Sequence, residues 1–255
     1  MSTTPTTRLR DRRIVVTGAA RGIGEAIAAS CAAEGARLAL LDLDADGVAR
    51  LAARLGSGGR DHVHLAVDLA DPDATRAATE SAVDALGGVD VLVNNAGILR
   101  MAPLLDITVA DWDATMDVNA RSMLVTTQVV ARAMIAAGRG GSIVNMASMG
   151  GRVGSPGQAH YAASKAAVMA LTRVSAMELG GHGIRVNCLC PGYVLTEMGA
   201  DTRTPEMVAG WSALSPLGRC AAPDDVARMA VFLASDESAY CTGQALDVSG
   251  GMVMP

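Results

Sequence analysis

Residues 14–24 decide the fold of this chain, and they read IVVTGAARGIG. The apolar, β-branched start predicts a buried strand, and residues 25–34, which follow the last glycine, predict a helix. Glycines let the backbone turn tightly and approach a phosphate closely, while the free amides at the start of a helix favour negative charge. The spacing is G-x-x-x-G-x-G rather than G-x-G-x-x-G. The stretch therefore predicts a strand, a pyrophosphate-binding loop and a helix, in that order.

A second apolar run, residues 37–41, ends in Asp42, 18 residues after Gly24. An acidic side chain about 20 residues beyond such a loop can accept a hydrogen bond from a ribose 2′-hydroxyl. The same carboxylate would repel a 2′-phosphate, so Asp42 favours NAD over NADP. Two alternatives stay open, because Asp42 could instead be a turn or capping residue and because Arg21 could meet a 2′-phosphate.

Length and composition predict one domain. The chain has 255 residues and is 50% hydrophobic, which is enough to bury a large core. Apolar runs alternate with helical segments along the chain, a pattern typical of a parallel α/β sheet. We therefore expect a single-domain, Rossmann-like, doubly wound parallel sheet with helices on both faces, over residues 11–255. Residues 1–10 are polar and are expected to form a flexible N-terminal segment.

The charge of the chain argues against several classes of partner. Its formal net charge is −5 and its pI is near 5.3, which disfavours nucleic acid and anionic membrane surfaces. No apolar run reaches membrane-spanning length and residues 1–10 lack an apolar signal core, so we expect a cytoplasmic protein. The five cysteines form no C-x-x-C pair and the four histidines lack ligand spacing, so we expect neither disulfides nor a metal site.

Tyr161 and Lys165 stand four residues apart within a run that predicts one helix over residues 159–180. Side chains at this spacing share a helix face. Bringing the pKa of a tyrosine from ~10 to about 7 asks for roughly 4 kcal/mol of phenolate stabilisation. An ammonium about 5 Å away would supply roughly 3 kcal/mol at an effective dielectric of about 20, and an oxidised nicotinamide ring could supply the rest. We expect Tyr161 to exchange the proton and Lys165 to lower its pKa.

Ser148 and Asn119 are the other candidates for polar contacts at a site. Ser148 follows a predicted strand, residues 142–146, and ligands collect beyond the carboxyl ends of strands in open parallel sheets. Its hydroxyl could hold a substrate oxygen, although a serine after a strand is also a common turn residue. Asn119 lies in a predicted helical segment, residues 111–137, where its amide either faces solvent or makes a specific contact, and the residues alone favour solvent.

From about residue 12 to residue 252, these motifs resemble the short-chain dehydrogenase/reductase family. The matching segments are residues 17–24 (glycine loop), Asp68 (adenine-side aspartate), residues 94–97 (Asn-Asn-Ala-Gly) and residues 191–192 (proline-glycine turn). Ser148 precedes Tyr161 by 13 positions, as the family pattern expects. The resemblance implies a catalytic tetrad of Asn119, Ser148, Tyr161 and Lys165.

The resemblance also implies a nicotinamide cofactor, with Thr196 at its carboxamide. The implied cofactor contacts are Gly18, Arg21, Gly22, Ile23, Gly24, Asp42, Asp68, Asn95, Ala96, Gly97, Tyr161, Lys165, Pro191, Gly192, Val194 and Thr196. Family members commonly form dimers or tetramers through the helices that contain Asn119 and Tyr161. We therefore expect a homo-oligomer, with a tetramer favoured.

The substrate side of the site is less sharply marked. Residues 193–216 mix apolar and charged side chains, as a mobile substrate lid would, although a packed surface helix over about residues 205–214 explains the same pattern. The predicted substrate contacts are Ser148, Met149, Val153, Gln158, Tyr193, Met198 and Trp211. Arg152 could bind an acidic substrate group, but an arginine in a glycine-rich loop is more often solvated.

Three functions are compatible with these residues. Asp42 and the tetrad favour an NAD-dependent oxidoreductase that moves a hydride between the cofactor and a secondary alcohol, a polyol or the corresponding ketone. Arg21 alone favours the alternative, an NADPH-dependent ketoreductase of the 3-oxoacyl thioester type. A non-catalytic NAD-binding sensor is the third, and the presence of Ser148, Tyr161 and Lys165 together argues against it.

Overall fold

A parallel sheet forms the central layer of the computed structural model, which describes residues 7–57, 59–198, 200 and 203–254. Within those residues seven strands pair in the order β3-β2-β1-β4-β5-β6-β7, and every pairing is parallel. The strands are β1 (Arg13–Thr17), β2 (Arg37–Asp42), β3 (Val63–Ala66), β4 (Val91–Asn94), β5 (Gly141–Met146), β6 (Ile184–Pro191) and β7 (Ala245–Val248). The predicted doubly wound, Rossmann-like fold is confirmed.

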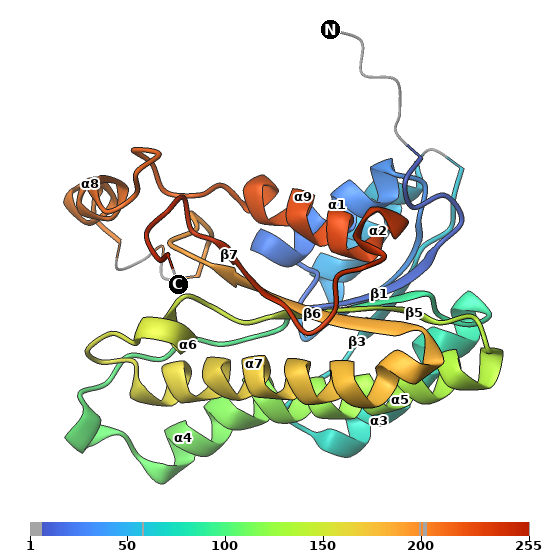
Figure 1. Ribbon diagram of the computed structural model, residues 1–255, viewed down its shortest axis with the longest axis horizontal. Coiled ribbons are helices and arrows are strands. Elements are labelled where there is room, and N and C mark those ends of the chain that lie inside the picture. Colours follow the sequence, from blue (N-terminus) through green and yellow to red (C-terminus); the bar gives the residue numbers. More distant parts are fainter. Residues whose placement is uncertain (1–6, 58, 199, 201–202, 255) are drawn as a thin grey trace, which may run out of the picture.

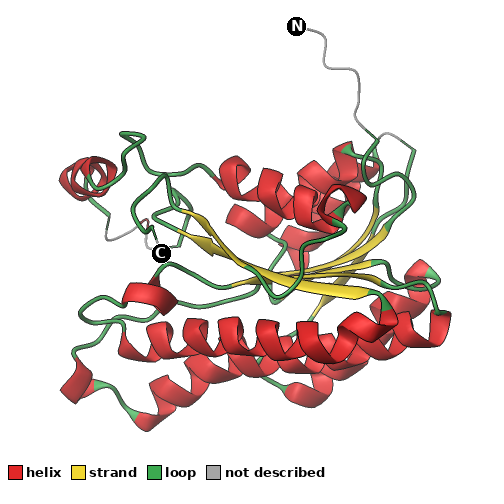
Figure 2. Cartoon of the chain, viewed as in Figure 1, coloured by secondary structure: helices red, strands yellow, loops and turns green. Residues whose placement is uncertain are grey.

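Helices cover both faces of the sheet (Figures 1 and 2). One face carries α1 (Gly22–Ala33), α2 (Ala45–Gly56) and α9 (Pro223–Ala234), and the other carries α3 (Pro72–Leu86), α4 (Val109–Met116), α5 (Ser122–Ala137) and α7 (Ala159–Leu179). The shorter helices α6 (Gly150–Val153) and α8 (Pro205–Ala213) lie toward one end of the molecule in this view. In the part of the chain that is described, each helix is too short or too polar to span a lipid bilayer.

Each strand divides its apolar side chains between two cores. In β1, Ile14 and Val16 pack with α1, α2 and α9, whereas Val15 packs with α3, α5 and α7. Leu40 and Leu41 of β2 are divided between the same two cores. Successive side chains of a strand point to opposite faces, so a sheet covered on both sides needs continuous apolar runs. The runs at residues 14–16 and 37–41 have this composition for that reason.

The helical segment predicted over residues 111–137 is interrupted. It consists of α4 and α5 joined by a π-helical turn, η2 (Asp117–Arg121), with Asn119 at its middle. Such single π turns occur mostly inside helices and frequently at functional sites. The turn gives Asn119 an environment that a regular amphipathic pattern does not predict.

The structured chain begins earlier than predicted. Leu9 is fully buried in the core between the sheet and α1, and Arg8 donates a hydrogen bond of 2.5 Å to the Glu34 carboxylate. Part of the predicted flexible segment 1–10 is therefore fixed on the body of the protein, because a leucine in it completes the core. Residues 1–6 lie outside the described residues.

The strand order reverses between β1 and β4, since β2 and β3 continue from β1 on one side and β5 to β7 continue from β4 on the other. Loops that leave the carboxyl ends of two such strands diverge, and ligands bind in the crevice between them. Here those loops are the glycine loop after β1 and residues 95–97 after β4. The fold thus places two of the predicted motifs at one crevice.

Candidate active site

The glycine loop is held in one tight shape by the loop that follows β4. A Cβ atom on Gly24 would lie 1.9 Å from the carbonyl oxygen of Gly18, which has φ +64° itself. The side-chain NH2 group of Asn95 donates to the carbonyl oxygens of Thr17 and Gly18 at 3.1 and 2.9 Å. The backbone amide of Ala96 donates to the Thr17 hydroxyl at 3.1 Å. Asn95 and Ala96 therefore support the loop, and only glycine fits at its closest approach.

The amino end of α1 is open to an anion. The helix begins at Gly22, with Ile23 next, and its N-cap residue is Arg21. The Arg21 side chain is exposed and makes no capping hydrogen bond. The backbone amides of the first turn are thus available to a ligand, and the helix dipole favours negative charge there. The tight loop and the open helix end fit the pyrophosphate of a dinucleotide.

Asp42 ends β2 beside this loop. One carboxylate oxygen accepts from the Ala20 amide at 2.9 Å and the other accepts from the Asp44 amide at 3.0 Å. The turn role that the sequence left open is therefore real. A carboxylate offers about four lone-pair sites, so Asp42 keeps capacity to accept from a ribose hydroxyl. Asp68 stands exposed after β3, and its carboxylate accepts from the Ala70 amide at 2.9 Å.

The chain that leaves β6 is anchored at its start. β6 ends at Pro191, and the Gly192 amide donates to the Val248 carbonyl at 3.1 Å. Val194 then forms a parallel bridge with Ala221. These contacts fix the direction in which the segment leaves the sheet.

Thr196 lies further along that segment and approaches the amino end of α1. A Cβ atom on Gly22 would lie 3.4 Å from the methyl carbon of Thr196 and 3.3 Å from a carboxylate oxygen of Glu197. The residue predicted for the nicotinamide side therefore lies against the loop predicted for the pyrophosphate.

Ser148, Tyr161 and Lys165 converge just beyond the carboxyl end of β5. Lys165 Nζ donates to the Met146 carbonyl oxygen at 2.8 Å and lies 5.8 Å from the centre of the Tyr161 ring. A Cβ atom on Gly150 would lie 3.3 Å from the Ser148 hydroxyl oxygen and 3.4 Å from Tyr161 Cε1. The predicted shared helix face is confirmed, and a hydroxyl, a phenol and an ammonium form one cluster.

Burial dominates the ionisation of this cluster. It raises the pKa of Tyr161, and a hydrogen bond with Ser148 opposes that rise only in part. It also lowers the pKa of Lys165, which is fully buried, to about 8. Burial of the ring and the Ser148 hydrogen bond are the two influences on Tyr161 here, so the expected lowering of its pKa by Lys165 together with an oxidised nicotinamide stays a prediction.

Asn119 is buried, not solvated as the residues alone suggested. Its side-chain oxygen accepts from the Ile98 amide at 2.8 Å, and its NH2 group donates to the Ile98 carbonyl and to Ser164 Oγ, both at 3.0 Å. Ser164 Oγ in turn donates to the Tyr161 carbonyl at 2.7 Å. The π turn thus makes Asn119 a link between the loop after β4 and the helix that carries Tyr161.

We expect Asn119→Ala to lower the thermal midpoint by roughly 5–15 °C. The truncation leaves partly buried backbone groups of Ile98 unpaired at about 1–3 kcal/mol each, and 1 kcal/mol is worth about 2–4 °C in a chain of this size. Calorimetry would measure the shift, with Gln244→Ala as the control, since Gln244 is an exposed amide just before β7. A midpoint equal to that of the control would contradict the linking role.

Gly97 joins the cofactor side of the site to the catalytic cluster. It belongs to the loop after β4 that also supports the glycine loop, and a Cβ atom on it would lie 3.3 Å from both Asn119 Oδ1 and Lys165 Nζ. The loop after β4 therefore contacts both the glycine loop and two of the predicted catalytic residues, Asn119 and Lys165. All four predicted catalytic residues lie in this region of the protein.

The predicted substrate residues lie on two segments, one that follows Ser148 and one that follows β6. Tyr193 stacks on Trp211 of α8, with ring centres 4.5 Å apart and an interplanar angle of 8°. Met149 is half-buried at the start of α6, and Gln158 is half-buried at the start of α7. Val153 and Met198 are 64% and 49% exposed. The helix expected near residues 205–214 is present as α8, and the structure leaves its role as a lid a prediction.

Arg152 is paired and largely shielded, so its guanidinium is already committed within the protein. Its Nε donates to Asp247 Oδ1 at 2.8 Å, and its Nη2 donates to the Ala245 carbonyl oxygen at 2.5 Å. This pair joins α6 to β7. The sequence offered no signal for it, because Arg152 and Asp247 lie far apart in the chain.

Three contributors to the site were not predicted. Ile98 holds Asn119 through its backbone, Met146 accepts from Lys165, and Ser164 bridges Asn119 to Tyr161. Two of the three act through backbone atoms, for which side-chain chemistry gives no signal. Ser164 could have been found, since it lies three residues after Tyr161 on the same helical turn.

Histidines and cysteines stay outside this chemistry. His160 is fully buried beside Tyr161, and its ring nitrogens have no hydrogen-bond partner among the described residues. All five cysteines are free thiols, four of them buried. The described residues contain no group of three or more His, Cys, Asp or Glu side chains that could hold a metal ion.

The fold and the site together define a dinucleotide-binding α/β enzyme. A family model described as enoyl-(acyl carrier protein) reductase matches residues 18–253. A D-threitol dehydrogenase from Mycolicibacterium smegmatis is 42% identical over 96% of this chain and 94% of its own length. A 3-oxoacyl-(acyl-carrier-protein) reductase from Thermotoga maritima is 42% identical over 97% of this chain and 100% of its own length.

A solved structure from Beutenbergia cavernae superposes with a TM-score of 0.92, at 41% identity over 98% of this chain and 99% of that one. It is described as an NAD(P)-dependent gluconate 5-dehydrogenase with NADP bound at low occupancy. This chain belongs to the short-chain dehydrogenase/reductase family. It is therefore an oxidoreductase of alcohols and ketones, as the sequence predicted.

Proposed function

We propose that this protein is an NAD-dependent dehydrogenase of secondary alcohols or polyols that also reduces the corresponding ketones. The observation that carries the proposal is the cluster of Ser148, Tyr161 and Lys165 at the crevice beside the glycine loop. The similarity to a D-threitol dehydrogenase supports a polyol as substrate. The similarity to a 3-oxoacyl thioester reductase supports the alternative, an NADPH-dependent ketoreductase.

In the proposed mechanism, Tyr161 removes the hydroxyl proton of an alcohol during oxidation and returns it during reduction. Ser148 holds the substrate oxygen, because its hydroxyl lies beside the Tyr161 ring. Lys165 and Asn119 keep that ring in place through Met146 and Ser164. A bound nicotinamide would supply hydride exchange and, when oxidised, a positive charge that favours phenolate. The groups that would hold it are the glycine loop, the open end of α1, Asp42 and Lys165.

Asp42 supports NAD in this proposal. We expect Asp42→Asn to lower the ratio of kcat/KM for NAD to kcat/KM for NADP by roughly 10- to 100-fold, which corresponds to about 1.4–2.8 kcal/mol of removed charge repulsion and lost ribose contact. Asp46→Asn, an equal change of charge in the first turn of α2, should leave the ratio unchanged. A wild-type protein that strictly requires NADP would overturn the choice of NAD.

The proposed activity is tested by following NADH formation with a panel of secondary alcohols and polyols, and NADH consumption with ketones. Turnover with NAD and a polyol supports it. Turnover confined to 3-oxoacyl thioesters with NADPH would establish the alternative. Tight NADH binding without turnover on any substrate would favour a sensor.

We also infer a cytoplasmic homo-oligomer, with a tetramer favoured. Five free cysteines suit a reducing compartment. Apolar side chains are exposed on α5, at Leu124, and on α7, at Val174 and Met177, which is consistent with an interface through these helices. Light scattering of the purified protein would test the assembly, and a monomer at micromolar concentration would contradict it.

A further inference from the structure

The segment that follows Ser148 depends on neighbouring elements for its position. It is α6, a single turn of four residues, two of them glycine. A helix this short is not stable by itself, so its position depends on contacts with neighbouring elements. Ser148 lies two residues before this turn, and its hydroxyl accepts from the Gly150 amide at 3.0 Å. Displacement of α6 would therefore displace the serine.

Two of the supports of α6 come from β6 and α7. The Met149 amide donates to the Pro191 carbonyl at 3.0 Å. Gly151 packs so closely on α7 that a Cβ atom on it would lie 2.7 Å from the carbonyl carbon of Lys165. These contacts fix one end and one side of the turn, and they are made mainly by backbone atoms.

A further support of α6 is a side chain that ties it to β7. Arg152 reaches across to donate to Asp247 Oδ1 at 2.8 Å and to the Ala245 carbonyl at 2.5 Å. Both side chains are largely shielded, with 23% and 12% of their surfaces exposed. Burial is the largest single influence and would lower the pKa of Arg152, but the charges and hydrogen bonds of Asp247 and Cys190 together outweigh it, and the pKa is raised. Arg152 thus makes two directed hydrogen bonds to β7, one of them to Asp247, and a shielded ion pair held in this way keeps its geometry better than an exposed one.

We propose that Arg152 and Asp247 are positioning residues that hold α6, and with it Ser148, at the distance from Tyr161 that the reaction needs. The proposal rests on the oxidoreductase activity proposed above. The pair touches neither substrate nor cofactor in this assignment, and it acts through the backbone of α6. It is distinct from the tetrad because it lies on the β7 side of the turn.

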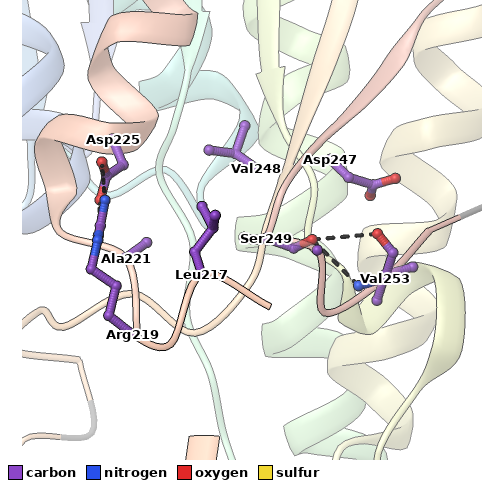
Figure 3. Close-up of a pocket in the computed structure, with 10 residues that line it drawn as sticks. Leu217, Arg219, Ala221, Asp225, Asp247, Val248, Ser249 and Val253 are labelled. Atoms are coloured by element: carbon purple, nitrogen blue, oxygen red, sulfur yellow. Dashed lines mark hydrogen bonds and ion pairs between the residues drawn. The ribbon is translucent and has the colours of Figure 1, made fainter. Parts of the chain in front are cut away.

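A second ion pair near β7 provides a matched control. Asp247 lines a cavity of about 390 Å³ whose wall also includes Arg219 and Asp225, and Figure 3 shows this second pair on the opposite side of the cavity from Asp247. Arg219 Nη1 donates to Asp225 Oδ2 at 2.6 Å. The Arg219–Asp225 pair joins the start of α9 to the residues just before it and does not contact α6.

The experiment compares Arg152→Gln, Asp247→Asn, the double variant and Arg219→Gln. We expect each of the first two to lower kcat by roughly 10- to 100-fold, since a misplacement of about 1 Å at a reacting group costs up to about 10²-fold. The affinity for NADH should not change, because the glycine loop is untouched. The double variant should be no slower than the slower single variant, and Arg152→Lys should restore part of kcat because it keeps the charge but not both hydrogen bonds.

The pH profile separates positioning from general stability. A displaced Ser148 no longer lowers the pKa of Tyr161, so oxidation by Arg152→Gln should need a higher pH, as it should in Ser148→Ala. The charged neighbours of Tyr161 on α7, Lys165 above all, are unchanged in both variants. Arg219→Gln should keep the wild-type profile and kcat. A lower thermal midpoint for Arg152→Gln with kcat and profile unchanged would overturn the proposal.

Hydrogen–deuterium exchange tests the pair without relying on turnover. Amides of residues 147–153 should exchange faster in Arg152→Gln and Asp247→Asn than in the wild type or Arg219→Gln. Unchanged protection there would overturn the proposal whatever the activity. If the wild type turned over no substrate, the proposed function would fail, and faster exchange of residues 147–153 would still support the positioning pair.

Discussion

Tyr161→Phe is expected to bind NADH as tightly as the wild type and to lose roughly 10²- to 10⁴-fold in turnover, the usual contribution of a positioned acid or base. The change removes one oxygen atom and keeps the ring. The helix, the contact of the Lys165 ammonium with Met146 and the bond from Ser164 to the Tyr161 carbonyl all stay in place. Steady-state kinetics and a fluorescence titration with NADH would measure the two effects separately.

Tyr240→Phe is the matched control, because Tyr240 is fully exposed. It should retain wild-type turnover. Full turnover by Tyr161→Phe would remove the phenol from the mechanism, and loss of NADH binding would show that the phenol is needed for the cofactor instead.

The protonation states of Tyr161 and Lys165 should make the rates of oxidation and reduction depend on pH in opposite ways. Burial raises the pKa of Tyr161, so below that pKa the phenol keeps its proton and can donate it, which favours ketone reduction. Oxidation needs the phenolate, so its rate should rise with pH until the pKa of Tyr161 in the cofactor complex is passed. Burial lowers the pKa of Lys165 to about 8. The rise of the oxidation rate with pH should therefore weaken above about pH 8, because Lys165 loses its positive charge there.

Much of the fold could be predicted because it follows from local patterns. The run at residues 14–16 is apolar on both faces because helices cover both sides of β1. The glycines that follow it are required by backbone approaches too close for any side chain, so their spacing is visible in the sequence. Tyr161 and Lys165 lie on one helix, and their relation is fixed by the helical repeat.

The rest depends on contacts between distant segments. The π turn at Asn119 leaves no mark in the hydrophobic pattern of the sequence. It is nevertheless the local structure in which the Asn119 side chain is buried. The acceptor for Lys165 is a backbone carbonyl of Met146, and the pKa of Tyr161 depends on how much water the completed fold excludes. The pairing of Arg152 with Asp247 needs β7 beside α6, which only the assembled sheet provides.

Gly24→Ala is expected to abolish measurable NADH binding, with a loss of more than about 100-fold in affinity, or about 2.8 kcal/mol. The added methyl carbon would lie 1.9 Å from the Gly18 carbonyl oxygen and 2.6 Å from Asn95 Nδ2. Neither neighbour can yield freely, because Asn95 holds the loop through that same nitrogen. The loop must therefore open, which moves the first-turn amides of α1 away from the position that fits a pyrophosphate.

Gly210→Ala is the control for this substitution. Gly210 lies within α8 with no atom near its missing side chain, so the same methyl group should raise helix stability by up to about 1 kcal/mol and leave NADH affinity unchanged. Calorimetric titration with NADH and a thermal melt of both variants would compare them. If Gly24→Ala bound NADH with wild-type affinity while remaining folded, the glycine loop would not be the pyrophosphate site. The cofactor would then have to bind elsewhere on the sheet, away from the crevice between β1 and β4, and the assignment of Asp42 would fail with it.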